Sequence, residues 1–159
     1  MMNRPVGQDE GMGQVVATAE GVVRAPAERV RAALADYAGT RRRMLTEQFS
    51  EYRVTEGGEG TVARVHWKLA ATSKRVRDQD VVVTATPDGG LVEDDANSSM
   101  VTTWTVHPAD AGTSTVRVRS TWNGAGGVGG FFERTFAPKG LRRIHEGLIS
   151  RLAAELSAG

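Results

Sequence analysis

The sequence predicts an α+β protein in which a curved antiparallel β-sheet wraps around a long C-terminal α-helix. Two patterns predict this class: a series of short alternating segments between positions 49 and 122, separated by Gly and Pro turns, and an amphipathic segment over residues 131–156. A sheet and a helix must bury their apolar faces against each other. Because a broad antiparallel sheet twists and curls, we expect a groove or cavity between the two.

The first part of the chain is expected to form a tail, one strand and one helix. Residues 1–13 hold charged residues and glycines without an apolar run, which is typical of a flexible N-terminal tail, and residues 14–157 are expected to form a single domain. Residues 15–23 have the composition of a strand. Pro26 suits the first position of a helix that runs to about Asp36.

Six strands are expected in the central region, each closed by a turn. Their ranges are 49–56, 60–69, a segment within 74–86, 91–95, 99–106 and 113–122. The second of them alternates strictly. It therefore places Trp67 and Leu69 on one face of the sheet, and His66 on the other.

The strand within residues 74–86 fits two registers. In one register Arg77, Gln79, Val81 and Val83 point inward. In the other register Asp78 and Asp80 point inward instead. A charged residue inside the protein would need a partner and would be a candidate for a functional site.

The last expected element is a long amphipathic helix, kinked near Pro138. At about 100° per residue, its apolar residues cluster within one sector that should pack on the sheet. These residues are Leu141, Ile144, Leu148 and Leu152.

The composition excludes several classes of protein. With no cysteine, the chain has no disulfide framework, no Cys-ligated zinc and no cysteine nucleophile. Its net charge of +1 gives no general attraction to nucleic acid or to an anionic membrane. No apolar run is long enough to span a membrane and the N-terminus has no targeting signal, so a cytoplasmic location is expected.

Two further patterns suggest cofactor or metal chemistry that their surroundings do not support. Residues 124–129 carry a GxGxxG motif, but no strand follows them, so we interpret the glycines as a hinge into the helix and expect no dinucleotide cofactor. His66, His107 and His145 do not have the spacing of metal ligands, so no metal site is expected.

Three segments resemble those of a known superfamily. They are residues 22–30, residues 97–104, and residues 124–132 followed by Phe136-Ala137-Pro138. In these segments and in the order of its elements, the chain resembles the START-like, Bet v-like helix-grip superfamily. That group includes polyketide cyclases and aromatases, lipid-transfer domains and small bacterial polyketide cyclase/dehydrase-like proteins. The resemblance implies a helix-grip fold with a cavity for an apolar molecule, and it assigns no catalytic residue.

Side chains from the inner faces of the strands and from the helix are expected to line this cavity, which should enclose roughly a few hundred Å³. The ligand-binding candidates are Trp67, Trp104, Trp122, Phe132, Phe136, Leu141, Leu148, Met100 and Thr102. His145 lies at the edge of the helix's apolar face and is the first candidate for proton transfer. Tyr37 or an inward Asp80 is the candidate helper.

Two charged runs invite different interpretations. The run Arg41-Arg42-Arg43 should lie near the mouth of the cavity, either as a solvated turn or as a docking site for an acidic carrier protein or an anionic ligand group. The acidic run over residues 93–95 is expected to be a solvated flank of a hairpin.

Three functions are compatible with this sequence. The first hypothesis is binding of a small apolar or aromatic ligand in the cavity, because residues suited to acid/base chemistry are sparse on the expected inner faces. The second is a cyclase, aromatase or dehydratase acting on a polyketide-like substrate held in the cavity. The third is a protein-interaction module. The sequence leaves open whether the protein is an enzyme.

Overall fold

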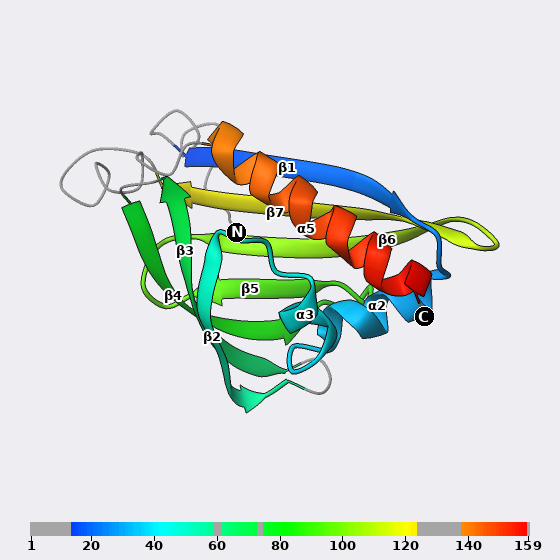
Figure 1. The fold of residues 1–159 in the computed structure, drawn as a ribbon, viewed down its shortest axis with the longest axis horizontal. Coiled ribbons are helices and arrows are strands. Elements are labelled where there is room, and N and C mark those ends of the chain that lie inside the picture. The colour runs from blue at the N-terminus through cyan, green and yellow to red at the C-terminus, as the bar shows by residue number, and fades with distance from the viewer. Residues whose placement is uncertain (1–13, 59–61, 73–74, 124–137, 159) are drawn as a thin grey trace, which may run out of the picture.

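Seven antiparallel strands form one sheet in the computed structural model, which describes residues 14–58, 62–72, 75–123 and 138–158. The strands are β1 (Gln14–Val23), β2 (Phe49–Gly57), β3 (Ala63–Thr72), β4 (Arg75–Ala85), β5 (Leu91–Asp95), β6 (Val101–Asp110) and β7 (Thr113–Asn123). Their spatial order is β1-β7-β6-β5-β4-β3-β2. Figure 1 shows β2 and β3 running steeply across the direction of β1 and β7, so the sheet is strongly curved.

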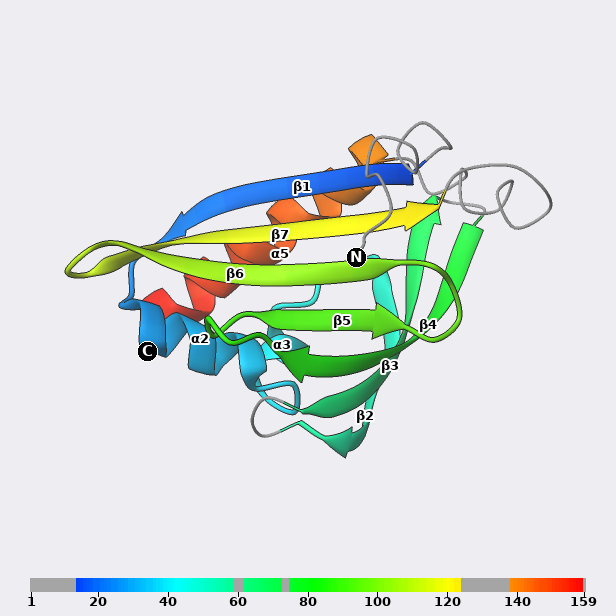
Figure 2. The same ribbon diagram turned by 180° about the vertical axis from the view of Figure 1, so that it is seen from behind.

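One long helix, α5 (Pro138–Ala158), packs on the concave face of the sheet, mainly along β1. Figure 2 shows the sheet from behind, with α5 beyond β1 and β7. The helix comes so close to β1 that a Cβ at Gly21 would lie 2.7 Å from Cγ2 of Ile149. The predicted α+β class, with a curved antiparallel sheet around a C-terminal helix, is therefore confirmed.

Alternation along the strands sorts the side chains between the concave and the convex face. On β3, Trp67 and Leu69 are buried, as predicted. On β4, Gln79, Val81 and Val83 are buried, which decides between the two registers that the sequence allowed.

Asp80 consequently lies on the convex face, away from the helix. Its carboxylate forms an ion pair with Arg64 of β3 at 2.8 Å, and this ion pair lowers the pKa of Asp80. The register with an inward Asp80 is therefore not the one that the protein adopts, because inward placement of Gln79 and Val81 forces the residue between them outward.

Two short helices, α2 (Ala27–Ala35) and α3 (Thr40–Arg43), lie next to the end of α5 that carries the C-terminus (Figure 1). Between them, the carboxylate of Asp36 accepts hydrogen bonds from the backbone N–H groups of Gly39 and Thr40, at 3.1 and 2.9 Å. These bonds lower the pKa of Asp36 and fix the start of α3. The carbonyl of Gly58 accepts the N–H of Tyr37 at 3.1 Å, which ties this connection to the end of β2.

α5 begins at Pro138 in the described part of the chain, where a missing N–H costs nothing in the first helical turn. The preceding seven residues of the expected helix, and the glycine hinge, lie outside the described residues. The apolar face is placed as predicted, and its residues Leu141, Ile144, Leu148 and Leu152 are all buried. No helix in the described ranges combines the length and the apolar character needed to cross a membrane.

Replacing Leu148 with Ala should lower the free energy of unfolding by about 2–5 kcal/mol, because the side chain is 4% exposed in a closely packed core. Ser150→Ala, on the exposed face of the same helix, is the matched control and should change it by less than about 0.5 kcal/mol. Denaturant titration measures both values. A loss of less than about 0.5 kcal/mol for Leu148→Ala would show that this side chain is not part of the core.

Candidate functional site

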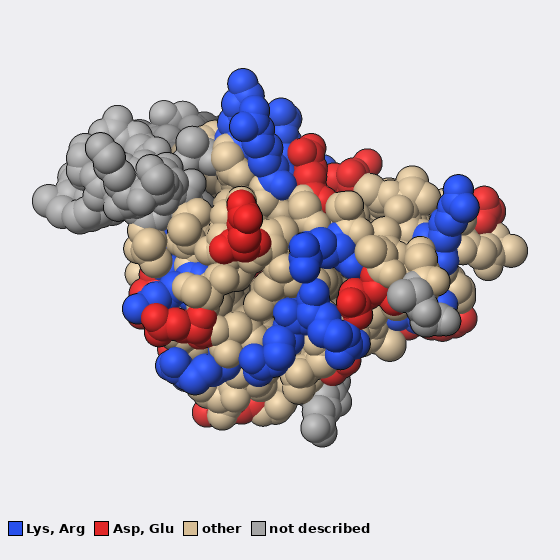
Figure 3. Space-filling view, in the orientation of Figure 1, with Lys and Arg blue, Asp and Glu red and all other residues tan. Residues whose placement is uncertain are grey.

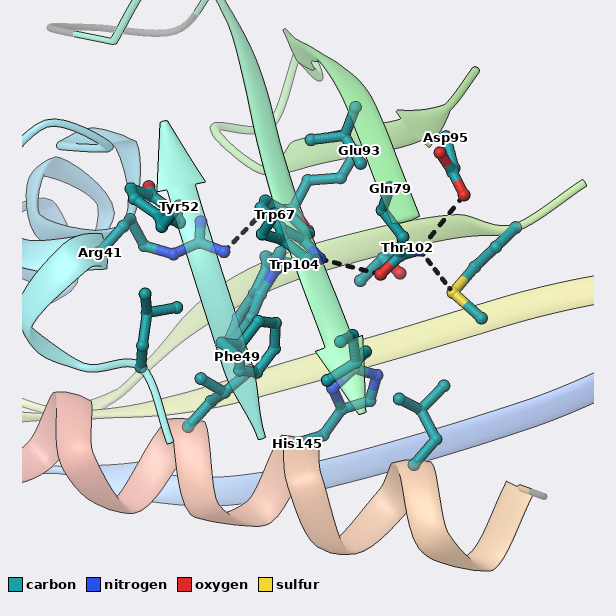
Figure 4. A pocket seen from close by; sticks show the side chains of 16 residues that line it. Arg41, Phe49, Tyr52, Trp67, Gln79, Glu93, Asp95, Thr102, Trp104 and His145 are labelled. Carbon is teal, nitrogen blue, oxygen red and sulfur yellow. Dashed lines mark hydrogen bonds and ion pairs between the residues drawn. The ribbon is translucent and has the colours of Figure 1, made fainter. Parts of the chain in front are cut away.

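A pocket lies between the concave face of the sheet and α5, and both sequence candidates and unexpected residues line it (Figure 4). Its lining residues are Arg41, Leu45, Phe49, Tyr52, Trp67, Leu69, Gln79, Val81, Glu93, Asp95, Met100, Thr102, Trp104, Leu141, His145 and Leu148. Aromatic and aliphatic side chains dominate the wall, and a few buried polar groups interrupt it. This mixture is typical of a site for a small organic molecule.

The free volume of the pocket is about 30 Å³. That is room for one or two water molecules, far less than the few hundred Å³ predicted from the sequence. The reason is that large side chains turn inward and fill the space, among them Arg41, Tyr52 and Trp67. A ligand of ordinary size therefore has to displace part of the wall.

A buried ion pair closes one end of the pocket. Nη2 of Arg41 lies 2.7 Å from Oε2 of Glu93, and the two side chains are only 6% and 4% exposed. Nη1 of the same guanidinium donates to the carbonyl of Leu34 at 3.1 Å. The guanidinium also lies over the rings of Tyr37 and Trp104, at 4.3 and 4.9 Å from their centroids.

This ion pair corrects two expectations. Arg41 is neither a solvated residue nor part of a docking surface, because its guanidinium is buried and forms an ion pair with Glu93 inside the protein. Glu93 and Asp95 are not a solvated flank, since they are 4% and 3% exposed and line the pocket. Of the basic run, Arg42 and Arg43 are exposed.

Tyr37 stabilises the ion pair between Arg41 and Glu93, although it does not itself line the pocket. Its hydroxyl donates to Oε2 of Glu93 at 2.5 Å. Burial raises the pKa of Tyr37 well above its usual value, so the phenol stays protonated and acts as a donor. Burial also opposes the charge of Arg41, but the oxygens of Tyr37 and Glu93 outweigh it and hold the pKa of Arg41 above its ordinary value.

His145 reaches from α5 toward the sheet and is 6% exposed. Its Nε2 lies 2.8 Å from Oγ of Ser120, which in turn lies 2.6 Å from Oγ1 of Thr102. Burial lowers the pKa of His145 to about 4, so the imidazole is neutral at physiological pH. Within the described ranges, its Nδ1 has no hydrogen-bond partner.

A third polar group lies at the opposite end of the pocket from Arg41 in Figure 4. The indole N–H of Trp67 donates to Oε1 of Gln79 at 2.8 Å, and the amide of Gln79 donates to Asp95 at 3.3 Å. The carboxylate of Asp95 also accepts the backbone N–H of Asp80 and the hydroxyl of Ser98, at 3.0 and 2.7 Å. In these three hydrogen bonds the carboxylate of Asp95 is the acceptor.

The sequence candidates divide into three groups. Trp67, Met100, Thr102, Trp104, Leu141, His145 and Leu148 line the pocket. Trp122 is buried at 1% exposure and Tyr37 at 0%, but neither is among the lining residues. Phe132 and Phe136 lie outside the described residues.

Sequence reasoning did not bring Arg41, Glu93, Asp95 and Gln79 together as one polar set within an apolar pocket, and it also missed the lining residues Leu45, Phe49 and Tyr52. A signal for two of them was present. Leu91, Glu93 and Asp95 alternate along one strand, so burial of the leucine brings both acids to the inner face. Among the described residues, no three His, Cys, Asp or Glu side chains come together as metal ligands would.

Comparison with known proteins identifies the family. Residues 14–157 match the family model described as polyketide cyclase / dehydrase and lipid transport. The chain belongs to this family. The predicted resemblance to the START-like, Bet v-like superfamily is thereby confirmed.

Solved structures agree with this assignment. The solution structure of KanY protein (ms6282) has 45% sequence identity and a TM-score of 0.82, covering 92% of this chain and 99% of that one. TTHA0849 from Thermus thermophilus shares the fold at 18% identity, with a TM-score of 0.74 and coverage of 91% and 98%. So does the Zhui aromatase/cyclase from a Streptomyces species at 14% identity, with a TM-score of 0.72 and coverage of 89% and 93%. A search of curated proteins found no match.

Glu93→Gln should destabilise the protein by about 3–5 kcal/mol, because it leaves the guanidinium of Arg41 buried without a counter-charge. Asp94→Asn, at the exposed neighbouring position, removes the same charge and should change stability by less than about 0.5 kcal/mol. Denaturant titration of both variants makes the comparison. Equal effects would mean that the ion pair contributes no more than a surface charge does.

Acid should unfold the protein partly through His145. Its pKa is about 4 in the folded protein against an ordinary 6.5, so between these values the unfolded chain binds more protons. The stability contributed by neutral His145 is complete above pH 6.5 and is lost as the pH falls toward 4. Relative to His145→Gln, the wild type should lose about 3 kcal/mol of stability when the pH falls from about 7 to about 4. A difference that stays constant with pH would contradict this burial of the imidazole.

Proposed function

We propose that this protein binds a small planar aromatic molecule in the pocket between the sheet and α5. The observation that carries the proposal is the wall itself, in which Phe49, Tyr52, Trp67 and Trp104 surround buried polar atoms. Tyr52 stacks on Trp67 with ring centroids 6.1 Å apart and planes within 7°, so the wall already favours flat partners. Members of this family bind hydrophobic ligands or act as polyketide cyclases, which supports a cavity-bound organic ligand.

The ligand enters, in this proposal, by displacing the wall formed by Leu45, Phe49 and Tyr52. These three lining residues are only half-buried, whereas most of the others are buried. Phe49 and Tyr52 belong to β2, which is the last strand of the sheet and pairs on one side alone. Its pairing with β3 shifts register twice, and Glu51 adopts a φ of 52°, so this strand has fewer regular hydrogen bonds to break.

Catalysis of a cyclase or dehydratase type is the second candidate, and His145 is the observation that favours it. A neutral imidazole with an unpartnered Nδ1 can accept a proton from a carbon next to a carbonyl of the bound substrate. Ser120 would hold the ring in place through Nε2. The low pKa keeps the base free of a proton at neutral pH, although it also makes the base weak.

An acidic carrier protein would fit this second candidate as a partner. Figure 3 shows Lys and Arg side chains gathered over α3 and the adjoining part of α5. Arg42 and Arg43 of α3, and Arg143 and Arg151 of α5, are exposed there. Arg41 is not part of this surface.

A function in protein interaction alone has less support. Among the residues that the structure describes, the large exposed apolar side chains are valines. Val16 and Val22 lie on β1, and Val62, Val76 and Val82 lie in the region of β3 and β4. Three strands separate the two groups in the sheet, so these valines do not form one continuous patch.

The ligand-binding proposal is tested with 9-fluorenone, a neutral tricyclic aromatic molecule. Titration into ¹⁵N-labelled protein should give saturable chemical-shift changes at Trp67, Thr102 and Trp104. The exposed Val76 and Val82 on the convex face are the internal control and should not respond. Shifts confined to the convex face, or no shifts at all, would contradict binding in the pocket.

The catalytic candidate is tested with His145→Gln on a poly-β-keto thioester substrate. The variant keeps a polar side chain but loses acid/base function, so turnover should fall by roughly 10²–10⁴ while binding changes little. Thr102→Val, which cuts the hydroxyl chain without removing the imidazole, should have a smaller effect. Turnover that is unchanged in His145→Gln would remove this residue from the mechanism.

A further inference from the structure

The charges inside the pocket determine what kind of ligand it accepts. Three of the lining side chains carry a formal charge, namely Arg41, Glu93 and Asp95, and each of these residues is at least 95% buried. His145 is neutral. The guanidinium is already matched by Glu93, and Asp95 is held by neutral donors alone, so the formal charge of the lining is one negative.

A carboxylate on the ligand would therefore meet no cation whose charge is not already balanced. The described residues that line the pocket include a single cation, Arg41, and its Nη2 atom is bound to Glu93 at 2.7 Å. An incoming anion would lose its hydration and lie beside two buried carboxylates. Both effects oppose binding of fatty acids and of aromatic acids.

Two buried hydrogen-bond donors of the lining have no acceptor among the described residues, and they indicate which ligand groups the pocket favours. Nε1 of Trp104 and Nε of Arg41 are both buried, and neither has a partner within the described ranges. An indole N–H and a guanidinium N–H can only donate. Trp104 is 1% exposed and lines the pocket, so an acceptor for its N–H has to come from inside.

An uncharged oxygen meets both conditions. A ketone, ether or phenol oxygen accepts a hydrogen bond and adds no charge to the pocket. A hydrocarbon would enter without electrostatic cost but would leave the indole N–H unpaired. An unpaired buried donor costs more than the bond would have contributed.

We propose that the pocket selects uncharged, oxygen-bearing aromatic ligands over carboxylates, and that the indole N–H of Trp104 donates to the ligand's oxygen. This inference rests on the ligand-binding function proposed above and specifies its chemistry. It assigns Trp104 as a specificity-determining residue.

The test compares probes that share one ring skeleton. They are 9-fluorenone, fluorene, which lacks the oxygen, and 9-oxofluorene-4-carboxylate, which adds a charge. Affinities come from titrations followed by ¹H–¹⁵N spectra at neutral pH. The ketone should bind at least about tenfold more tightly than the carboxylate and about five- to tenfold more tightly than the hydrocarbon. Oleate, as a fatty-acid anion, should bind no better than the carboxylate probe.

Two readouts assign the donor. The indole N–H signal of Trp104 in the wild type should shift with the ketone far more than with fluorene, and this measurement needs no variant. Trp104→Phe should lower the affinity for the ketone about fivefold and leave that for fluorene nearly unchanged. Trp122→Phe, at a buried tryptophan outside the pocket lining, is the matched control and should alter neither affinity.

The outcomes distinguish a failure of this inference from a failure of the proposed ligand-binding function. Equal or tighter binding of the carboxylate would overturn the exclusion of anions while ligand binding stands. Equal losses for ketone and hydrocarbon in Trp104→Phe, with no selective shift of the indole signal, would overturn the role of Trp104. Failure of all three ring compounds to bind would overturn the proposed function, and the inference with it.

Discussion

The buried ion pair between Arg41 and Glu93 is the interaction on which the pocket depends. It joins the short helix α3 to the central strand β5, across 52 residues of sequence. Two buried charges are costly to desolvate, and they are tolerated here because the carbonyl of Leu34 and the hydroxyl of Tyr37 satisfy them further. The same pair fills one end of the cavity and balances the charge of Arg41, so packing and the proposed ligand preference have one physical origin.

The free volume of the pocket is small because inward side chains such as Arg41 fill it, and this limits how a ligand can bind. A cavity of about 30 Å³ is compatible with ligand binding only if part of the wall moves. The side of the sheet that holds β1, β7 and α5 is tightly packed, as the contact between Gly21 and Ile149 shows. The opposite edge, β2, is irregular and half-exposed. The structure thus combines a closely packed side, which holds Ser120 and His145, with an irregular edge through which a flat molecule enters in the proposal above.

The sequence was sufficient for the fold and for about half of the pocket. Alternation along the strand that holds Trp67, and the helical spacing of Leu141 and Leu148, depend on local geometry that a single segment reveals. Arg41 could not be placed in this way. The two residues that follow it are arginines that face solvent, and its burial depends on Glu93, which reaches it only through the curvature of the whole sheet. The two registers of β4 were likewise equivalent until neighbouring strands fixed one of them.

A double-mutant cycle between Arg41 and Glu93 tests the central claim most directly. The free energies of unfolding of Arg41→Met, Glu93→Leu and the double variant are measured by denaturant titration. The account predicts that each single variant is strongly destabilised, that the double variant loses much less than the sum, and that the coupling is about 1–3 kcal/mol. A coupling near zero, with additive losses, would contradict the claim that this buried pair holds the pocket together.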